Sequence, residues 1–378
     1  MSFAPNQLRI ARTLWERLQP LDRAMPGRLQ ALLADRRFGS RDRRFYRELL
    51  LTATRLARIL GSVTDETIWA ALVARACAAT RETEGFREAF AATPAPEFSA
   101  IDLMPEWFAE ECETGADPAV TARALLTRAP LWIRLQTDDP EEVLADWAAR
   151  GWIAERHPSL PDAWRLPPET NVTSARTYEE GRYEVQDAGS QHILAGLDFS
   201  SRSPGPRWLD ACAGAGGKTL QLARLLGPSA RIDATDTRSA PLAELRARAN
   251  RAGLAGRIRT PNTAGDAYDG VLVDAPCSGS GTWRRAPHLM ACTTQADLRA
   301  SAQLQATILD QAAPRVRPGG KLVYATCSIA RTENRSVAEA FLARHSNTYQ
   351  IDAPARTIAP GTDDNDGFYV ATFRRNTS

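Results

Sequence analysis

The sequence has 378 residues, of which 43% are hydrophobic and 24% charged, and its formal net charge is +2. This length suits two or three domains, and the composition excludes disordered and fibrous classes. No run of eighteen apolar residues occurs, and the first residues lack the apolar core of a signal peptide, which together predict a cytoplasmic protein without a membrane anchor.

The first hundred residues predict a helical domain. Apolar positions recur every three or four residues, and breaks are expected at Pro26-Gly27 and Gly61-Ser62. Residues 1–50 carry eleven arginines against five acids, which favours a phosphate-rich partner; a solvated helical surface is the alternative. The expected helices cover residues 8–18, 28–37, 41–60 and 65–79.

A small α/β module is predicted for residues 101–185. A proline-bearing stretch, residues 90–107, marks its boundary with the helical domain. Residues 130–137 and 162–167 read as strands, and residues 139–151 as a helix opened by Asp139 or Pro140.

Strands and helices alternate regularly after about residue 186. This rhythm predicts an α/β fold with a doubly wound parallel sheet, which binds ligands at the carboxyl ends of its strands. The expected strands are 207–212, 230–235, 270–275 and 321–326, followed by helices at 218–226, 240–253, 296–313 and 333–345.

The segment LDACAGAGGKT, residues 209–219, runs from a strand through a glycine-rich turn into a helix. Glycines let a ligand approach the backbone, and a helix amino terminus favours negative charge. The spacing is neither a P-loop nor a strict G-x-G-x-x-G, so a tight turn is the structural alternative. Asp236 follows the next strand and is placed to bond ribose hydroxyls, as in sites for a dinucleotide or for S-adenosylmethionine.

Two further segments, DAPCSGSGTW and YATCSI, each place a cysteine just after a strand. Cys277 and Cys327 are both plausible nucleophiles. Asp274 ends its strand and is a candidate to hold a substrate base, although a turn cap is the alternative. The six cysteines form no C-x-x-C pair and have no histidine at metal-ligand spacing, so we expect reduced thiols and no metal; Cys77, Cys112 and Cys292 are expected to be structural.

Together, DACAGAGGKT, DAPCSGSGTWRRAP, YATCSI with Glu333-Asn334, and DGFYVATFRR resemble the motif series of the RNA cytosine-5-methyltransferases. The nearest likeness is to the bacterial ribosomal RNA small-subunit methyltransferase B type, also called Fmu or Sun. VQDAGSQ, RAPLWIRLQT and LMPEWFAEE fit the same family, and residues 40–55 resemble its helical domain, which is similar to NusB. The resemblance implies a NusB-like RNA-binding domain (1–100), a small α/β linker or RNA-binding module (101–185) and a Rossmann-like class I S-adenosylmethionine-dependent methyltransferase domain (186–378).

The resemblance also gives both cysteines a task. Carbon 5 of cytosine is a poor nucleophile until a thiolate adds to carbon 6, and a second thiol or base then helps to remove the proton from carbon 5. In the family the attacking thiol corresponds to Cys327, and the thiol that assists product release corresponds to Cys277. Asp274 would bind the base, and Lys218 would belong to the same catalytic site.

The implied cofactor is S-adenosylmethionine, and the implied partner is RNA, most of all 16S ribosomal RNA, bound by a monomer. Aligning residues 257–265 with the family places Asn262 against adenine; Asp266 is the alternative. Arg284 and Arg285 are expected to contact RNA. The first motif departs from the family at Gly214 and at Ala215, which replaces a proline. The residues expected to bind the cofactor are Cys212, Ala213, Gly214, Ala215, Gly216, Gly217, Lys218, Asp236, Asn262 and Asp274.

The sequence thus predicts an RNA cytosine-5-methyltransferase. The altered first motif leaves a non-catalytic RNA-binding or ribosome-assembly factor as the alternative. Methylation of DNA or of a small molecule is a weaker hypothesis, because the upstream region resembles RNA-enzyme domains.

Overall fold

The computed structural model describes residues 3–199, 204–265 and 267–377, which form two compact units. The helical unit contains residues 1–110, 117–128 and 282–295, and the α/β unit contains residues 111–116, 129–281 and 296–378. The region 101–185 is therefore divided between the two units. The division into three domains at residues 1–100, 101–185 and 186–378 stays a prediction.

The helical unit forms where the apolar periodicity predicts it, with two errors. The helix expected over residues 41–60 is interrupted at Leu56 and forms two helices. Pro26 does not break a helix: it occupies the first turn of α2, where a missing N–H costs nothing. The Asp65 carboxylate caps α5 by accepting the N–H groups of Thr67 and Ile68. The helices are α1 (Phe3–Leu18), α2 (Met25–Leu33), α3 (Ser40–Arg55), α4 (Ala57–Leu60), α5 (Glu66–Ala76), α6 (Glu84–Phe90), η1 (Ala100–Leu103), α8 (Pro118–Leu126) and α14 (Pro287–Cys292), while α7 (Phe108–Glu111) spans the division between units.

A seven-stranded sheet organises the α/β unit, in the order β10-β11-β9-β8-β5-β6-β7. The expected parallel pairing is confirmed for the five neighbouring strands β9, β8, β5, β6 and β7. However, β11 pairs antiparallel with β9, and β10 pairs antiparallel with β11, so the sheet is mixed rather than wholly parallel. The strands are β5 (Arg207–Asp210), β6 (Arg231–Ala234), β7 (Ile258–Arg259), β8 (Tyr268–Asp274), β9 (Val316–Thr326), β10 (Tyr349–Ile358) and β11 (Phe368–Arg375).

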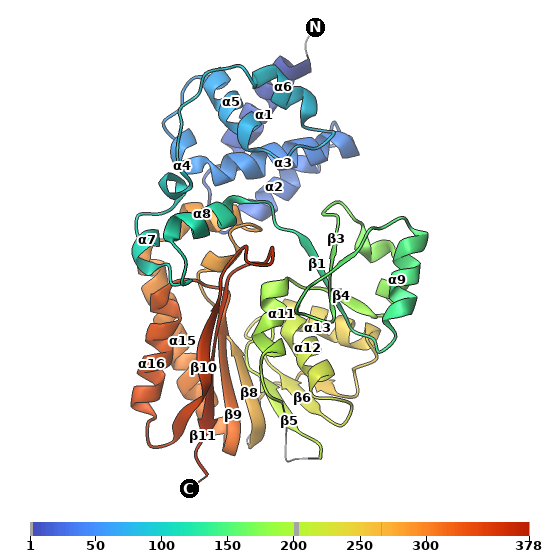
Figure 1. Ribbon diagram of the computed structural model, residues 1–378, viewed down its shortest axis with the longest axis vertical. Coiled ribbons are helices and arrows are strands. Elements are labelled where there is room, and N and C mark those ends of the chain that lie inside the picture. The colour runs from blue at the N-terminus through green and yellow to red at the C-terminus, as the bar shows by residue number, and fades with distance from the viewer. Residues whose placement is uncertain (1–2, 200–203, 266, 378) are drawn as a thin grey trace. The chain divides into compact units, whose positions relative to one another are not determined.

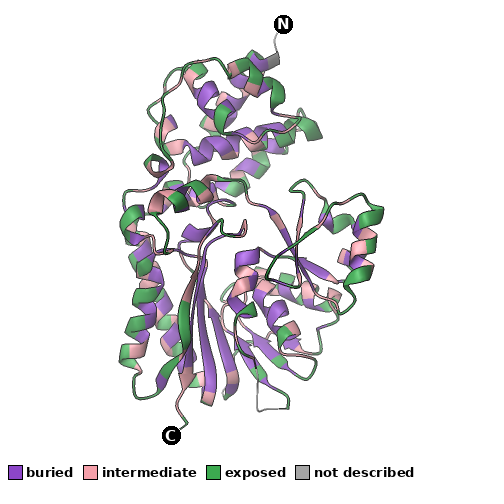
Figure 2. Ribbon diagram, viewed as in Figure 1, coloured by how far each residue is buried: buried purple, intermediate pink, exposed green. Residues whose placement is uncertain are grey.

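Helices cover both faces of this sheet, as Figure 1 shows. On one face Leu309 and Phe341 pack on strand residues such as Tyr324, and on the other face Leu220 and Leu245 pack on residues around Leu272. The central strands are therefore buried along most of their length (Figure 2). The first face is covered by α15 (Gln295–Ala312) and α16 (Arg335–Arg344), and the second by α11 (Ala188–Ala195), α12 (Gly217–Leu225) and α13 (Ser239–Arg251).

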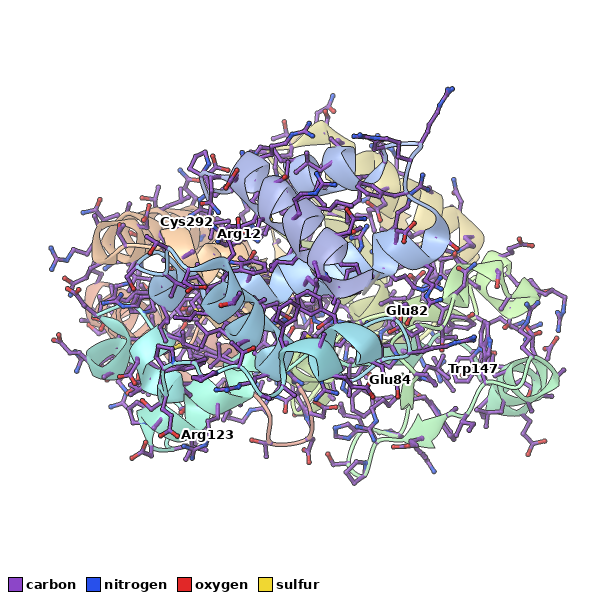
Figure 3. The ribbon with its side chains drawn as sticks, turned by 90° about the horizontal axis from the view of Figure 1, so that it is seen from above. Arg12, Glu82, Glu84, Arg123, Trp147 and Cys292 are labelled. Carbon is purple, nitrogen blue, oxygen red and sulfur yellow. The ribbon has the colours of Figure 1, made fainter. Side chains whose placement is uncertain are left out.

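A smaller antiparallel sheet with the order β2-β3-β1-β4 belongs to the same unit. Trp147 of its helix α9 is buried, and its ring centroid lies 5.2 Å from that of Tyr183 (Trp147 is labelled in Figure 3). None of the helices in the described ranges has the length and apolar character of a membrane span. The elements are β1 (Leu131–Leu135), α9 (Pro140–Ala149), β2 (Glu155–Arg156), β3 (Ala163–Leu166), η2 (Val172–Ser174), α10 (Arg176–Glu179) and β4 (Tyr183–Val185).

Candidate active site

The glycine-rich turn connects the carboxyl end of β5 to α12. Gly214 and Gly216 have positive φ angles of 51° and 86°, which favour glycine. A Cβ atom on Gly216 would lie 2.1 Å from Leu245, so packing also requires glycine there. The carbonyl of Ala215 accepts a hydrogen bond of 2.7 Å from Arg248. This contact holds the turn at the position where the family has a proline.

Asp236 follows β6 and lies beside the same turn. Its carboxylate accepts the N–H of Gly214 at 2.9 Å and pairs with Arg238 at 3.0 Å. Burial raises the pKa of Asp236, but the bonds from Arg238 and Gly214 outweigh it and hold the pKa below its ordinary value. An ionised acceptor beside a glycine turn fits ribose hydroxyls.

The other members of the expected cofactor set differ in their surroundings. Burial, with acids nearby, raises the pKa of Cys212 to about 12, so this thiol is neutral and suits packing rather than attack. Asn262 is exposed beyond β7, and Asp266 lies outside the described residues. The contact of Asn262 with adenine stays a prediction.

Lys218 and Asp274 meet at the carboxyl ends of β5 and β8. Their side chains form an ion pair with 2.9 Å between Nζ and Oδ2. Burial lowers the pKa of Lys218, but the charge of Asp274 and the hydrogen bond to it, together with other nearby groups, outweigh burial, so the pKa is raised and the ammonium stays protonated. The electrostatic interaction with Cys327 acts in the same direction.

Cys277 and Cys327 come together because β8 and β9 are parallel neighbours. Asp274 pairs in register with Ala325, so the segments that follow both strands leave the sheet side by side. The two sulfur atoms lie 3.3 Å apart. The hydrogen bond with Cys327, then burial, raises the pKa of Cys277 well above its ordinary value. Cys277 is therefore a neutral thiol within hydrogen-bonding distance of the sulfur of Cys327.

A buried carboxylate, Glu333, joins the two cysteine segments. Its oxygens accept the backbone N–H of Ser278 at 2.7 Å, the hydroxyl of Ser278 at 2.5 Å and the hydroxyl of Ser328 at 2.6 Å. The side chain of Gln305 donates to the carbonyl of Pro276 at 3.0 Å and to Glu333 at 3.4 Å. Each cysteine thus has a neighbour in sequence that is bonded to one acid. The sequence displayed Glu333 after YATCSI but gave no sign of this role.

The carboxyl-terminal motif, DGFYVATFRR, is hydrogen-bonded to the segment that contains Cys277. Gly367 donates its N–H to the carbonyl of Gly281 at 2.8 Å, and Gly281 in turn donates to the carbonyl of Cys327 at 3.0 Å. A Cβ atom on Gly281 would lie 2.1 Å from the oxygen of Gly367. DGFYVATFRR therefore positions the cysteines through backbone contacts.

Arg284 and Arg285 fall in the helical unit. Arg284 is only 3% exposed, and its guanidinium donates to the carbonyl of Arg128 at 2.9 Å. In this conformation it is a packing residue and does not present its charge to RNA. Arg285 is exposed, so its contact with RNA stays a prediction.

His157, His192 and Asp363 place potential metal-ligand atoms within 4.8 Å of one another. However, Nδ1 of His157 accepts the N–H groups of Ser159 and Leu160, both at 3.2 Å. The proton of a neutral His157 therefore resides on Nε2, the nitrogen 3.9 Å from Asp363. A metal ion bound at Nε2 would have to displace this proton, which argues against a metal site formed by His157, His192 and Asp363.

Comparisons with known proteins agree with the geometry. The family model described as 16S rRNA methyltransferase RsmB/F matches residues 201–374. The chain is 33% identical over 298 residues to ribosomal RNA small subunit methyltransferase B of Salmonella typhi, an alignment that covers 73% of this chain and 68% of the relative. The chain belongs to the RsmB/F family of 16S rRNA methyltransferases.

A second relative, ribosomal RNA small subunit methyltransferase B of Enterobacter sp. (strain 638), is 34% identical over 71% of this chain; the alignment covers 66% of that relative, just under two thirds. The crystal structure of PH0851 matches 99% of each chain with a TM-score of 0.76 at 22% identity, which supports the fold. The α/β methyltransferase fold preceded by a helical region is thereby confirmed.

Proposed function

We propose that this chain transfers the methyl group of S-adenosylmethionine to carbon 5 of a cytosine in 16S ribosomal RNA. The observation that carries the proposal is the 3.3 Å separation of two cysteine sulfurs at the ends of adjacent parallel strands. Membership of the RsmB/F family supports the substrate class. A protein that modifies ribosomal RNA is expected in the cytoplasm, and a monomer is expected because nothing in the motifs requires a second copy.

The residues of the turn fit the cofactor. Gly214 leaves backbone space open, Asp236 supplies an ionised acceptor for ribose hydroxyls, and the amino terminus of α12 faces the turn. S-adenosylmethionine supplies the methyl group when bound. Asp274, held by Lys218, bonds the amine edge of the cytosine, and Lys218 offsets the negative charge that develops nearby.

The two thiols act in sequence. Cys327 adds to carbon 6, and the Cys277 thiol stabilises the attacking sulfur by donating to it. Once the sulfur of Cys327 is bonded to carbon, it loses the charge and the hydrogen bond that raise the pKa of Cys277. The pKa of Cys277 then falls, so the thiol releases its proton to solvent, and the resulting thiolate accepts the proton from carbon 5 at the step where a base is required.

Incubation with labelled S-adenosylmethionine and 16S ribosomal RNA tests the proposal, and bisulfite mapping identifies the nucleotide. We expect one 5-methylcytosine that depends on Cys327. A folded protein that binds S-adenosylmethionine by calorimetry but methylates no RNA would count against it. Absence of cofactor binding would favour the non-catalytic RNA-binding alternative.

A further inference from the structure

The helical unit contains a cavity of about 310 Å³ that the proposed chemistry does not use. It lies among α3, η1 and α8, and its walls include the apolar side chains of Leu56, Phe98 and Leu103. Phe98 is 36% exposed, which is unusual for a large apolar residue. A concave site that combines apolar walls with polar side chains is typical of a ligand pocket.

Arg55 of α3 lines this cavity with an unsatisfied charge. The residue is 9% exposed, and its Nε has no hydrogen-bond partner among the described residues. One terminal nitrogen donates to the carbonyl of Arg284 at 3.3 Å, a neutral acceptor. A buried guanidinium without an anionic partner is costly, because desolvation is not offset by a counter-charge.

The surroundings of Arg55 are predominantly positive. Arg123 and Arg128 also line the cavity, whereas Glu48 is the acid that lines it. Glu48 already accepts the N–H of Ala78 at 3.1 Å and the hydroxyl of Thr52 at 3.4 Å. Burial lowers the pKa of Arg55, Glu48 opposes this, and the like charges of Arg128 and Arg284 lower the pKa further. The cavity therefore has an excess of positive charge that an anion would balance.

We propose that this cavity binds a phosphate group of RNA, with Arg55 and Arg123 as donors and Phe98 as a stacking surface for the adjoining base. Planar guanidinium groups bond phosphate oxygens in pairs, and unstacked bases in RNA rest on aromatic rings. Arg123, on α8 (labelled in Figure 3), is exposed and so reaches a ligand from the rim, whereas Arg55 forms the floor. The RNA source of the phosphate rests on the proposed function; the anion site does not.

The test uses the full chain and two probes. Inorganic phosphate is titrated against chloride at equal ionic strength, with the thermal unfolding midpoint as the readout, and a short single-stranded RNA is titrated by fluorescence anisotropy. Arg123→Ala and Arg55→Met should each weaken both interactions about tenfold, the loss expected for a charged hydrogen bond. Arg41→Ala, an exposed arginine in the first turn of α3 outside the cavity, is the matched control and should change neither.

The outcomes separate the possibilities. If only phosphate binding weakens, the cavity holds a free anion and the RNA assignment is overturned. If wild-type protein shows no phosphate-specific stabilisation, or Arg41→Ala acts like Arg123→Ala, the site itself is overturned. Arg123→Ala keeps the test decisive if Arg55→Met fails to fold, because Arg123 is exposed. Neither probe requires methyl transfer, so an inactive enzyme leaves both results readable.

Discussion

The ammonium of Lys218 lies 2.9 Å from a carboxylate oxygen of Asp274, and the two side chains differ in exposure: 9% for the lysine and 30% for the acid. The glycine-rich turn and the first cysteine segment are thus joined by one ion pair. The carboxylate of Asp274 is thus partly open to solvent, as the proposed contact with a base requires, whereas the ammonium of Lys218 is buried.

This asymmetry predicts unequal costs of substitution. Asp274→Ala leaves a buried ammonium without a partner and should lower the free energy of unfolding by about 2 kcal/mol. Lys218→Met leaves the carboxylate of Asp274 partly hydrated and should lower the free energy of unfolding by less. Urea denaturation of both variants and of the double variant measures the coupling; strictly additive costs would contradict a specific pair.

The roles of the two cysteines predict opposite phenotypes. Cys327→Ala should abolish both methyl transfer and the covalent protein–RNA adduct, because the attack on carbon 6 is lost. Cys277→Ala should permit attack but slow release, so that a denaturant-resistant adduct accumulates on a gel. Reversed phenotypes would show that Cys277 is the nucleophile.

The coupling between the sulfurs predicts a change in the reactivity of Cys277. In the wild type the pKa of Cys277 is raised first by its bond with Cys327, so alkylation should require a pH well above the ordinary range of a thiol. In Cys327→Ala that bond is absent, and the pH midpoint for alkylation of Cys277 should shift downward. Peptide mass spectrometry after timed iodoacetamide treatment measures both midpoints. An unchanged midpoint would remove the basis for the sequential use of the thiols.

Glu333 should control the geometry of both cysteines without touching the substrate. Glu333→Gln places an N–H₂ group against at least one hydroxyl or N–H donor, so the cysteine segments should shift and methyl transfer should fall about 100-fold. The matched control is Glu339→Gln, on the exposed side of α16. We expect a lower turnover rate with little change in affinity for S-adenosylmethionine; equal turnover of the two variants would refute a positioning role.

Asp210, at the end of β5, predicts a pH-dependent stability. Burial raises its pKa to about 7, whereas an unfolded aspartate titrates near ~3.9. The folded state therefore holds a proton that the unfolded state releases, and the stabilisation present below pH ~4 is lost as the pH rises to about 7. Asp210→Asn keeps an acceptor for Thr219 and removes the titration. Unfolding free energies from pH 5 to 8 should fall more steeply for the wild type; parallel curves would contradict the assignment.

The sequence predicted those features that depend on local pattern. The alternation of strands and helices was readable, and so was the placement of Cys277, Cys327, Lys218 and Asp236 at the carboxyl ends of strands, because parallel strands share an edge. The expected break at Pro26-Gly27 was wrong because a proline suits the first turn of a helix as well as it suits a break.

The remaining features depend on contacts between distant segments. Nothing in β11 itself specifies that it pairs antiparallel with β9. The role of Glu333 appears only when residues 276–280, 305 and 328 are brought together. Arg284 belongs to a motif that predicted a contact with RNA. Its side chain is nevertheless buried and bonded to the carbonyl of Arg128. Such pairings become visible only in the folded chain.

The inclusion of residues 282–295 in the helical unit affects how the chain matures during synthesis. Trp283 is fully buried there, with ring centroids 5.7 Å from Trp107 and 5.9 Å from Phe108. An amino-terminal fragment ending at Arg128 would lack this partner and leave aromatic surface open. On the ribosome the unit must await Gln295, 167 residues after Arg128, a delay of roughly 10–30 s at ordinary elongation rates. During that interval Trp107 and Phe108 lack the indole ring that packs on them in the complete unit.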